Sequence, residues 1–598
     1  MNTLHYSISC EQAKQHLYSI TLAIPEHQQE TLQLSLPAWI PGSYMVRDFS
    51  KHIVNLKAMI DSTSISTTFI DKQTFSIKTD GRPCVVTYQI YAYDDSVRTA
   101  YLDQFRGFFN GSSVFLCVST FEERNHQVTI ETPSFASNWK VATGLSRSSM
   151  TKKYDFGTYV AANYDELIDC PVELGDFESI EFDVFGVSHH LVLAGKHYAD
   201  RERLKRDLTK LCQHHIRLFN QPNDTSLPFK EYWFLTNVVP SGFGGLEHKN
   251  STALICSTFD LPNRNNPIQV SDGYKNFLSL ASHEYFHLWS VCRIKPMEFM
   301  PYQLDKELYT QQLWAYEGIT SYYDDFSLYR AGIISFDEYL TLLSAMISRV
   351  SRGQGQYKQN LLDSSFFTWT KFYQQGADAV NNIVSYYTKG ALVAVWLDLT
   401  IRNTTSGKYS LDDVMRRQWL RYQSEQEEYQ GTEFNDIFTI VESLAGASVR
   451  QDLFDILNGT NPVPLGNVMP YFGVSMINKP SMVSTITKAY SKEEAPFVGI
   501  GFKALDLGIE VTQILEHSPA EQAGIAVKDT IIAIDRIAVS SNNYEAIINN
   551  LSLDTDYSVD FIRNGLLVTA SLKVVSSPKE MVALTVSDEH KLALWQCH

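Results

Sequence analysis

Residues 275–296 read KNFLSLASHEYFHLWSVCRIKP, and this stretch decides how the centre of the chain folds. No Gly or Pro lies between Lys275 and Arg293, and Pro296 ends the run. Apolar residues recur through it at helical spacing, at Phe277, Leu280, Ala281 and Leu288. The sequence therefore predicts a helix over 275–293 that carries a His-Glu-x-x-His string.

This string predicts a metal site. On a helix, His283 and His287 lie one turn apart on the same face, so both imidazoles can bind one ion. Zinc accepts imidazole nitrogens, and hydrolytic zinc sites use three protein ligands plus a water. Glu284 stands where a carboxylate can take a proton from that water. The alternative is a core helix with two satisfied histidines, but an unpaired buried carboxylate is costly, which favours the metal.

A third ligand is expected downstream. Residues 313–323 read LWAYEGITSYY, a helix-compatible stretch with one acid among apolar and aromatic neighbours. Glu317 completes a His2Glu zinc site and leaves one position open for water. An ordinary solvated helix acid is the alternative. Asp324 and Asp325 can orient a ligand imidazole or form a solvated pair.

A glycine-rich segment, SGFGGLEHKNS at 241–251, follows the apolar run 232–239. A strand, a glycine turn and a second strand over 251–258 are expected to place Glu247 on an edge beside the helix. There the strand can pair with an extended peptide while Glu247 meets a positive charge. The alternative is a hairpin with a solvated acid.

The string Tyr-Tyr-Thr-Lys-Gly at 386–390 opens a predicted helix over 391–400. A tyrosine at this position can donate a hydrogen bond to the oxyanion of a tetrahedral intermediate. Aromatic packing at a helix start is the alternative.

These motifs, in this order, resemble those of the gluzincin aminopeptidases. Segments 37–44, 287–296 and 313–323 resemble the M61 glycyl aminopeptidase family in particular, and the resemblance covers nearly the whole chain. It implies an aminopeptidase in which His283, His287 and Glu317 bind one zinc ion and Glu284 is the catalytic acid–base. It further implies that Tyr387 stabilises the intermediate, that Gly244, Gly245 and Glu247 bind the substrate, and that the first residue removed is small, Gly or Ala.

Two departures separate the chain from the aminopeptidase N group within the gluzincins. His287 and Glu317 are separated by 29 residues, a longer gap than that group has, which favours M61. His248 stands where that group carries the Asn of its glutamate segment, so the amino-group contacts are expected to differ in detail.

Near the end of the chain, residues 499–502 read GIGF, 511–515 read VTQIL, 518–525 read SPAEQAGI and 529–535 read DTIIAID. Together these stretches resemble a PDZ domain of the bacterial protease kind. The resemblance implies that a loop of four residues, Gly499, Ile500, Gly501 and Phe502, covers the carboxylate of a peptide or protein C-terminus that pairs with the sheet edge. The alternative is a PDZ fold that only packs against the protease.

The chain has 598 residues, more than one core normally fills, and we expect a multidomain α+β protein. The predicted parts are an N-terminal β-sandwich-like domain (1–170), a mainly α-helical, thermolysin-like catalytic domain (171–460), a linker (461–485), a PDZ domain (486–580) and a C-terminal tail (581–598).

Composition bounds the partners and the compartment. A net charge of −17 without a basic stripe argues against nucleic acid and anionic membranes. We find no signal peptide or transmembrane segment by sequence pattern, and the eight cysteines form no Cys-x-x-Cys pair, so a cytoplasmic location is expected.

Two alternatives to an aminopeptidase stay open: a zinc endopeptidase with substrates presented by the PDZ domain, and an inactive peptide-binding scaffold.

Overall fold

The computed structural model describes residues 3–221, 223–265, 270–480 and 495–596. The chain divides into two compact units, one of residues 1–308, 331–333 and 419–431, the other of 309–330, 334–418 and 432–598. The prediction of a multidomain α+β fold is confirmed. Within the described part of the chain, no helix combines the length and apolar character needed to cross a bilayer.

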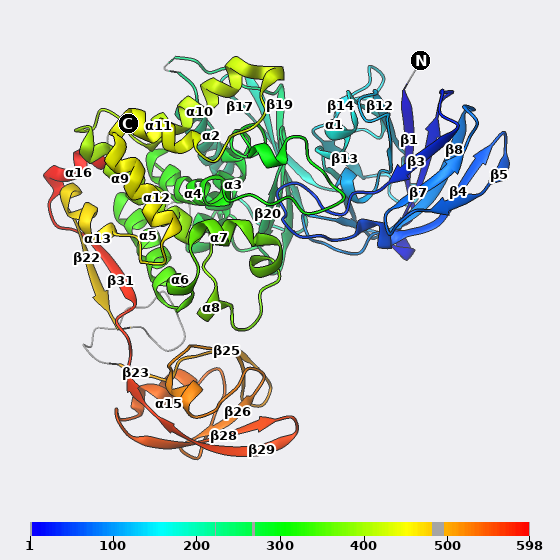
Figure 1. Cartoon of the computed structure of the whole chain (residues 1–598). Helices are drawn as coiled ribbons and strands as arrows, with labels where there is room; N and C mark the ends of the chain where they lie inside the picture. Colours follow the sequence, from blue (N-terminus) through cyan, green and yellow to red (C-terminus); the bar gives the residue numbers. More distant parts are fainter. Residues whose placement is uncertain (1–2, 222, 266–269, 481–494, 597–598) are drawn as a thin grey trace. The chain divides into compact units, whose positions relative to one another are not determined.

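The first unit begins with a β-rich region (blue to cyan in Figure 1). One sheet has the order β14-β15-β12-β1-β2-β8-β4-β5, and two four-stranded sheets run β13-β16-β10-β9 and β11-β3-β7-β6. Residues of β8 alternate between buried and more exposed positions, as expected for strands with one face on a core. The strands are β1 (Leu4–Gln12), β2 (Leu17–Ile24), β3 (Thr31–Ser35), β4 (Ile53–Ile60), β5 (Thr63–Ile65), β6 (Thr67–Phe69), β7 (Thr74–Lys78), β8 (Cys84–Tyr91), β9 (Ala100–Leu102), β10 (Arg106–Phe109), β11 (Cys117–Val118), β12 (His126–Ile130), β13 (Lys140–Thr143), β14 (Ser146–Arg147), β15 (Gly157–Ala161) and β16 (Val172–Gly175).

A five-stranded mixed sheet follows in the same unit, with the order β17-β18-β19-β21-β20. Its strands are β17 (Glu178–Val184), β18 (Val187–Ala194), β19 (Glu231–Val239), β20 (Gly244–Glu247) and β21 (Ser251–Ser257). The three central strands are parallel, and β19 is almost continuously buried, as strands covered on both faces are. The glycine segment differs from the prediction, because Gly244–Glu247 is itself a strand, antiparallel to β21 at the sheet edge.

Two helices pack on this sheet, α2 (Arg201–Phe219) and α3 (Asp272–Phe286). Helix α3 begins at its N-cap Ser271, whose side chain accepts a hydrogen bond from the Tyr274 amide. The prediction that this helix continues to Arg293 is wrong, because α3 ends at Phe286 with His287 as C-cap. Beyond the helix end the chain turns, and the Arg293 guanidinium donates to the Leu288 carbonyl within this turn at 2.8 Å.

The second unit is mainly helical. A π-helical turn over Trp314–Gly318 continues into α4 (Ile319–Arg330), and α9 (Thr388–Thr404) packs against both. Other helices of this unit are α5 (Phe336–Ser351), α6 (Gly355–Lys358), α7 (Leu361–Phe366), α8 (Ala379–Asn382), α11 (Asp436–Ala445) and α12 (Ala447–Asn458). Helix α9 is buried along most of its length, which makes it the centre of this unit.

The PDZ fold lies at the end of the second unit. Its sheet contains β24 (Ile500–Ala504), β25 (Ile509–Ile514), β26 (Thr530–Ile534), β28 (Asp556–Arg563) and β29 (Leu566–Lys573), with α15 (Tyr544–Asn550) beside it. Two strands outside this sheet, β22 (Val474–Lys479) and β31 (Met581–Val586), pair with each other (Figure 1), and α16 (Glu589–Gln596) follows. The predicted linker and the predicted tail therefore both contain a strand. Residues 481–494, which include the end of that linker and the predicted start of the PDZ domain, lie outside the described residues.

Candidate active site

The edge strand β20 runs along the helix that carries the His-Glu-x-x-His string. A Cβ atom added at Gly245 would lie 2.0 Å from Oε1 of Glu284, so no residue with a side chain fits there without displacing that carboxylate. Glu284 is 5% exposed and Glu247 is 7% exposed. Strand β20 therefore places its own glutamate near one end and the helix glutamate against its middle.

The Glu247 carboxylate is also approached by a loop from the N-terminal region. A Cβ atom at Gly42 would lie 2.5 Å from Oε2 of Glu247, and Gly42 has a φ of +83°, a conformation that favours glycine. Nearby, the Trp39 indole donates to the carbonyls of Gln303 and Lys306 at 3.0 and 2.8 Å, which anchors the loop. The segment 37–44, which resembled the M61 family in sequence, thus packs directly on the glutamate expected to bind substrate.

The two histidines of the string converge. Their Nε2 atoms lie 3.0 Å apart, and Nδ1 of His287 lies 2.6 Å from the carbonyl of Ser290. A carbonyl can only accept, so Nδ1 of His287 carries the proton and its Nε2 presents a lone pair. This tautomer is the one that a metal ligand needs.

Glu317 belongs to the same candidate metal group. His283, His287 and Glu317 are the members of this group, and each offers one ligand atom. Two imidazole nitrogens and one carboxylate oxygen are the donor set of many hydrolytic zinc sites. The residues present therefore fit a zinc ion.

The Tyr-x-Lys-Gly string lies next to Glu317 within the second unit. A Cβ atom at Gly318 would lie 2.6 Å from Cα of Gly390, so the two glycines let the π-helical turn approach the start of α9. Tyr387 caps α9, is partly exposed, and its hydroxyl lies 3.4 Å from that of Tyr373. Lys389 is fully buried, and burial lowers the pKa of its ammonium to about 8.

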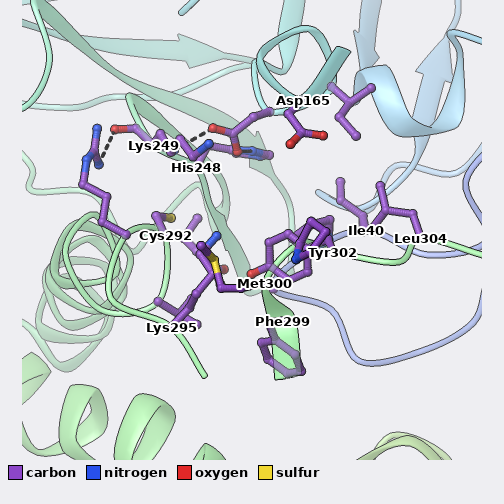
Figure 2. Close-up of a pocket in the computed structure, with 18 of the residues that line it drawn as sticks. Ile40, Asp165, His248, Lys249, Cys292, Lys295, Phe299, Met300, Tyr302 and Leu304 are labelled. Atoms are coloured by element: carbon purple, nitrogen blue, oxygen red, sulfur yellow. Dashed lines mark hydrogen bonds and ion pairs between the residues drawn. The ribbon is translucent and has the colours of Figure 1, made fainter. Parts of the chain in front are cut away.

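A cavity of about 240 Å³ adjoins Glu247 within the first unit. Figure 2 shows Asp165 and, from the segment 292–302, Cys292, Lys295 and Tyr302 around this space. Burial, reinforced by nearby Lys249, lowers the pKa of Lys295 to about 8. The cavity therefore combines apolar walls with buried ionisable groups.

His248 lines this cavity with a defined orientation. Its Nδ1 lies 3.2 Å from Oδ1 of Asp169. Burial raises the pKa of the Asp169 carboxyl, but hydrogen bonding and the charges of His248 and Lys249 outweigh it and hold the pKa below its usual range. The sequence could not indicate Asp169, which lies 79 residues from His248.

The predicted PDZ loop lies at the start of β24. Gly499 has a φ of +84°, and its carbonyl accepts from the Leu515 amide at 2.9 Å. Ile500, Gly501 and Phe502 form the first part of β24 and pair with β25. Phe502 packs edge-on against Tyr544 of α15, with ring centroids 4.7 Å apart.

Comparison with known proteins gives one family for the two larger regions. Residues 5–176 match the peptidase M61 N-terminal domain, residues 276–393 match the M61 glycyl aminopeptidase, and residues 496–574 match the PDZ domain. No curated protein matches the chain significantly in sequence.

Among solved structures, an aminopeptidase N family protein from Idiomarina loihiensis is similar with a TM-score of 0.95 and 39% identity, covering 100% of both chains. An M1 zinc metallopeptidase from Deinococcus radiodurans has a TM-score of 0.47 and 12% identity, covering 77% of this chain and 94% of that one.

Proposed function

The chain belongs to the M61 glycyl aminopeptidase family and is a zinc metallopeptidase, and we propose that it removes single small residues, glycine or alanine, from the free N-terminus of peptides. The observation that carries the proposal is the edge strand β20, which brings Glu247 and the helix glutamate Glu284 to one short stretch of backbone. An exposed strand edge binds extended peptide through main-chain hydrogen bonds. A carboxylate near its end then recognises an ammonium group.

His283, His287 and Glu317 are proposed to hold the zinc ion, which when bound supplies an acidified water and polarises the scissile carbonyl. In this proposal Glu284 takes the proton of the attacking water and later delivers it to the leaving amine. The Glu284 carboxylate lies where a side chain on residue 245 would begin, so the glycine there leaves room for it. Ser290 holds His287 in the tautomer that leaves Nε2 free to bind metal.

Tyr387 is proposed to donate a hydrogen bond from its hydroxyl group to the oxyanion of the tetrahedral intermediate. Its place at the start of α9, where Gly390 contacts the turn that carries Glu317, supports this role. Glu247 is proposed to bind the α-ammonium of the substrate, with Gly244 and Gly245 pairing with its backbone.

The PDZ loop of residues 499–502 is proposed to bind the carboxylate of a peptide C-terminus, supported by the match to the PDZ family.

Two substitutions test the scheme. Glu284→Gln should abolish turnover while zinc stays bound one per chain, as measured by elemental analysis. Glu247→Ala should raise KM for free-amine substrates such as Ala-p-nitroanilide. Equal activity of Glu284→Gln and wild type would remove Glu284 from the mechanism. No change in KM for Glu247→Ala would remove Glu247 from amine recognition.

A further inference from the structure

A second charged group lies on the same edge strand, near the end opposite Glu247. Arg98 is half-buried, and its Nη2 donates to the Gly245 carbonyl at 3.4 Å. Its Nη1 would lie 3.8 Å from a Cβ atom placed on Gly244. The strand thus carries a carboxylate at one end and a guanidinium beside the other.

The position of Arg98 is fixed by its neighbours in the chain. Asn110 is fully buried, and its amide donates to the carbonyls of Val97 and Thr99, at 2.8 and 3.2 Å. The Arg98 amide also lies 3.4 Å from Oγ of Ser96. The backbone on both sides of Arg98 is therefore held from the interior, and the guanidinium projects from a rigid support.

Its hydrogen-bonding capacity is largely unused within the described residues. Nε of Arg98 is buried without a hydrogen-bond partner there, and the single bond to Gly245 is long. By contrast, the guanidinium of Arg106, in the same unit, donates two hydrogen bonds of 2.7 Å to Glu173. A buried donor without an acceptor costs free energy, so a ligand with acceptor oxygens is expected at Arg98.

The length of β20 indicates which part of a bound peptide would lie beside Arg98. Strands rise about 3.3 Å per residue, so Gly245 and Gly244 lie roughly 7 to 10 Å along the strand from Glu247. A substrate with its α-ammonium at Glu247 and its backbone antiparallel to β20 brings its second or third residue beside these glycines. When the peptide ends there, its carboxylate meets the guanidinium, whose planar fork suits two carboxylate oxygens.

We infer that Arg98 binds the C-terminal carboxylate of the substrate and so directs the enzyme to dipeptides and tripeptides. This inference rests on the proposed aminopeptidase function. It concerns the binding of short peptide substrates and not the chemical step, so Arg98 is a specificity residue.

The test compares trialanine with trialanine amide, which differ only in the terminal charge. Wild type should show kcat/KM for the acid roughly tenfold or more above that for the amide, since a charge-assisted hydrogen bond contributes at this level. In Arg98→Gln, kcat/KM should fall for trialanine and stay unchanged for trialanine amide, so that the ratio is lost. Arg98→Lys should keep part of the ratio. Arg82→Gln, an exposed arginine of the same region, is the matched control for loss of charge and should keep the wild-type ratio.

Peptide length gives an independent readout. For wild type, kcat/KM should fall from trialanine to hexaalanine, and for Arg98→Gln it should stay flat. Equal rates for acid and amide in wild type, or equal losses on both in Arg98→Gln, would overturn the role of Arg98. Ala-p-nitroanilide separates the two claims, because it has no carboxylate. Failure of wild type to cleave it would contradict the aminopeptidase function itself, whereas cleavage without acid–amide discrimination contradicts the Arg98 inference alone.

Discussion

At the scale of single residues, the site depends on where side chains are absent. Gly245 admits the Glu284 carboxylate, and Gly42 admits that of Glu247, both at distances that a Cβ atom would forbid. The sequence showed these glycines but not what approaches them. The contacts join residues far apart in the chain, and local patterns carry no information about such pairs.

Gly245→Ala should therefore destabilise the protein by about 1–3 kcal/mol and displace Glu284, with loss of most activity, because the added methyl group overlaps the carboxylate. Thermal unfolding and a steady-state assay measure the two effects. Gly244→Ala is the stability control, since its methyl group would meet only Arg98 at 3.8 Å and the melting temperature should hold. An equal fall in melting temperature for both variants would contradict this account.

Lys389 makes the free energy of unfolding depend on pH. Burial lowers the pKa of its ammonium to about 8, against 10.5 for the ordinary side chain. Between these values the unfolded chain binds more protons than the folded chain, so this residue makes stability rise with pH across that window. The stability advantage of Lys389→Met over wild type should be largest below pH 8 and shrink toward pH 10.5.

Urea unfolding at pH 7, 9 and 10 measures this difference. Lys408→Met, an exposed lysine of the same unit, is the control and should show no such trend. A constant difference between Lys389→Met and wild type across these pH values would show that Lys389 titrates normally.

At the scale of elements, the helical spacing of Phe277, Leu280, Ala281 and Leu288 predicted a helix, and the helix is present. Its end was not predictable, because Phe286 is followed by residues that are equally compatible with a helix. The turn that follows the helix is held by Arg293, whose guanidinium donates to the carbonyls of Leu288, Lys249 and Pro228 at 2.8, 3.0 and 3.1 Å. Lys249 and Pro228 are distant in sequence, so no local signal marks this contact.

Arg293→Met should leave three carbonyls without their donor and cost about 3 kcal/mol in the free energy of unfolding. It should also weaken zinc binding by roughly tenfold, because the turn that holds Ser290 against His287 loosens. Chemical unfolding and competition with a chelator measure the two quantities. Arg217→Met, an exposed arginine on α2, is the control. Unchanged zinc affinity in Arg293→Met would show that the turn holds without it.

For the edge strand β20, too, local sequence did not predict the secondary structure. The apolar run over 232–239 and the segment over 251–258 were expected to be strands, and both are present as β19 and β21. The segment between them was expected to turn, because it is rich in glycine. It instead forms β20, where glycine meets the need for close approach of Glu284.

At the scale of the whole molecule, the order of a β-rich region, a helical region and a PDZ domain could be predicted from composition and motifs. The pairing of β22 with β31 could not, because it joins residues about one hundred positions apart on either side of the PDZ sheet. Within the second unit, the PDZ domain also contacts α8, where the Asn381 side chain bonds the Ile514 carbonyl at 2.7 Å and the Glu516 amide at 2.9 Å.

Asn381→Ala should therefore increase hydrogen exchange of the amides over residues 514–517, because it removes both bonds to that loop. Mass spectrometry of peptic fragments measures the change. Gln451→Ala, an exposed residue on α12, is the control. Unchanged exchange in Asn381→Ala would mean that other contacts hold the loop.

The central claim is that a zinc-dependent site removes residues from a free N-terminus. The measurement that tests it most directly is hydrolysis of glycyl and alanyl p-nitroanilides beside their N-acetylated forms, with and without a chelator. The account predicts cleavage of the free-amine forms alone, abolished by the chelator and restored by zinc. Cleavage of the acetylated forms at comparable rates would contradict it and make the enzyme an endopeptidase, and cleavage of neither form would contradict the proposed activity on small first residues.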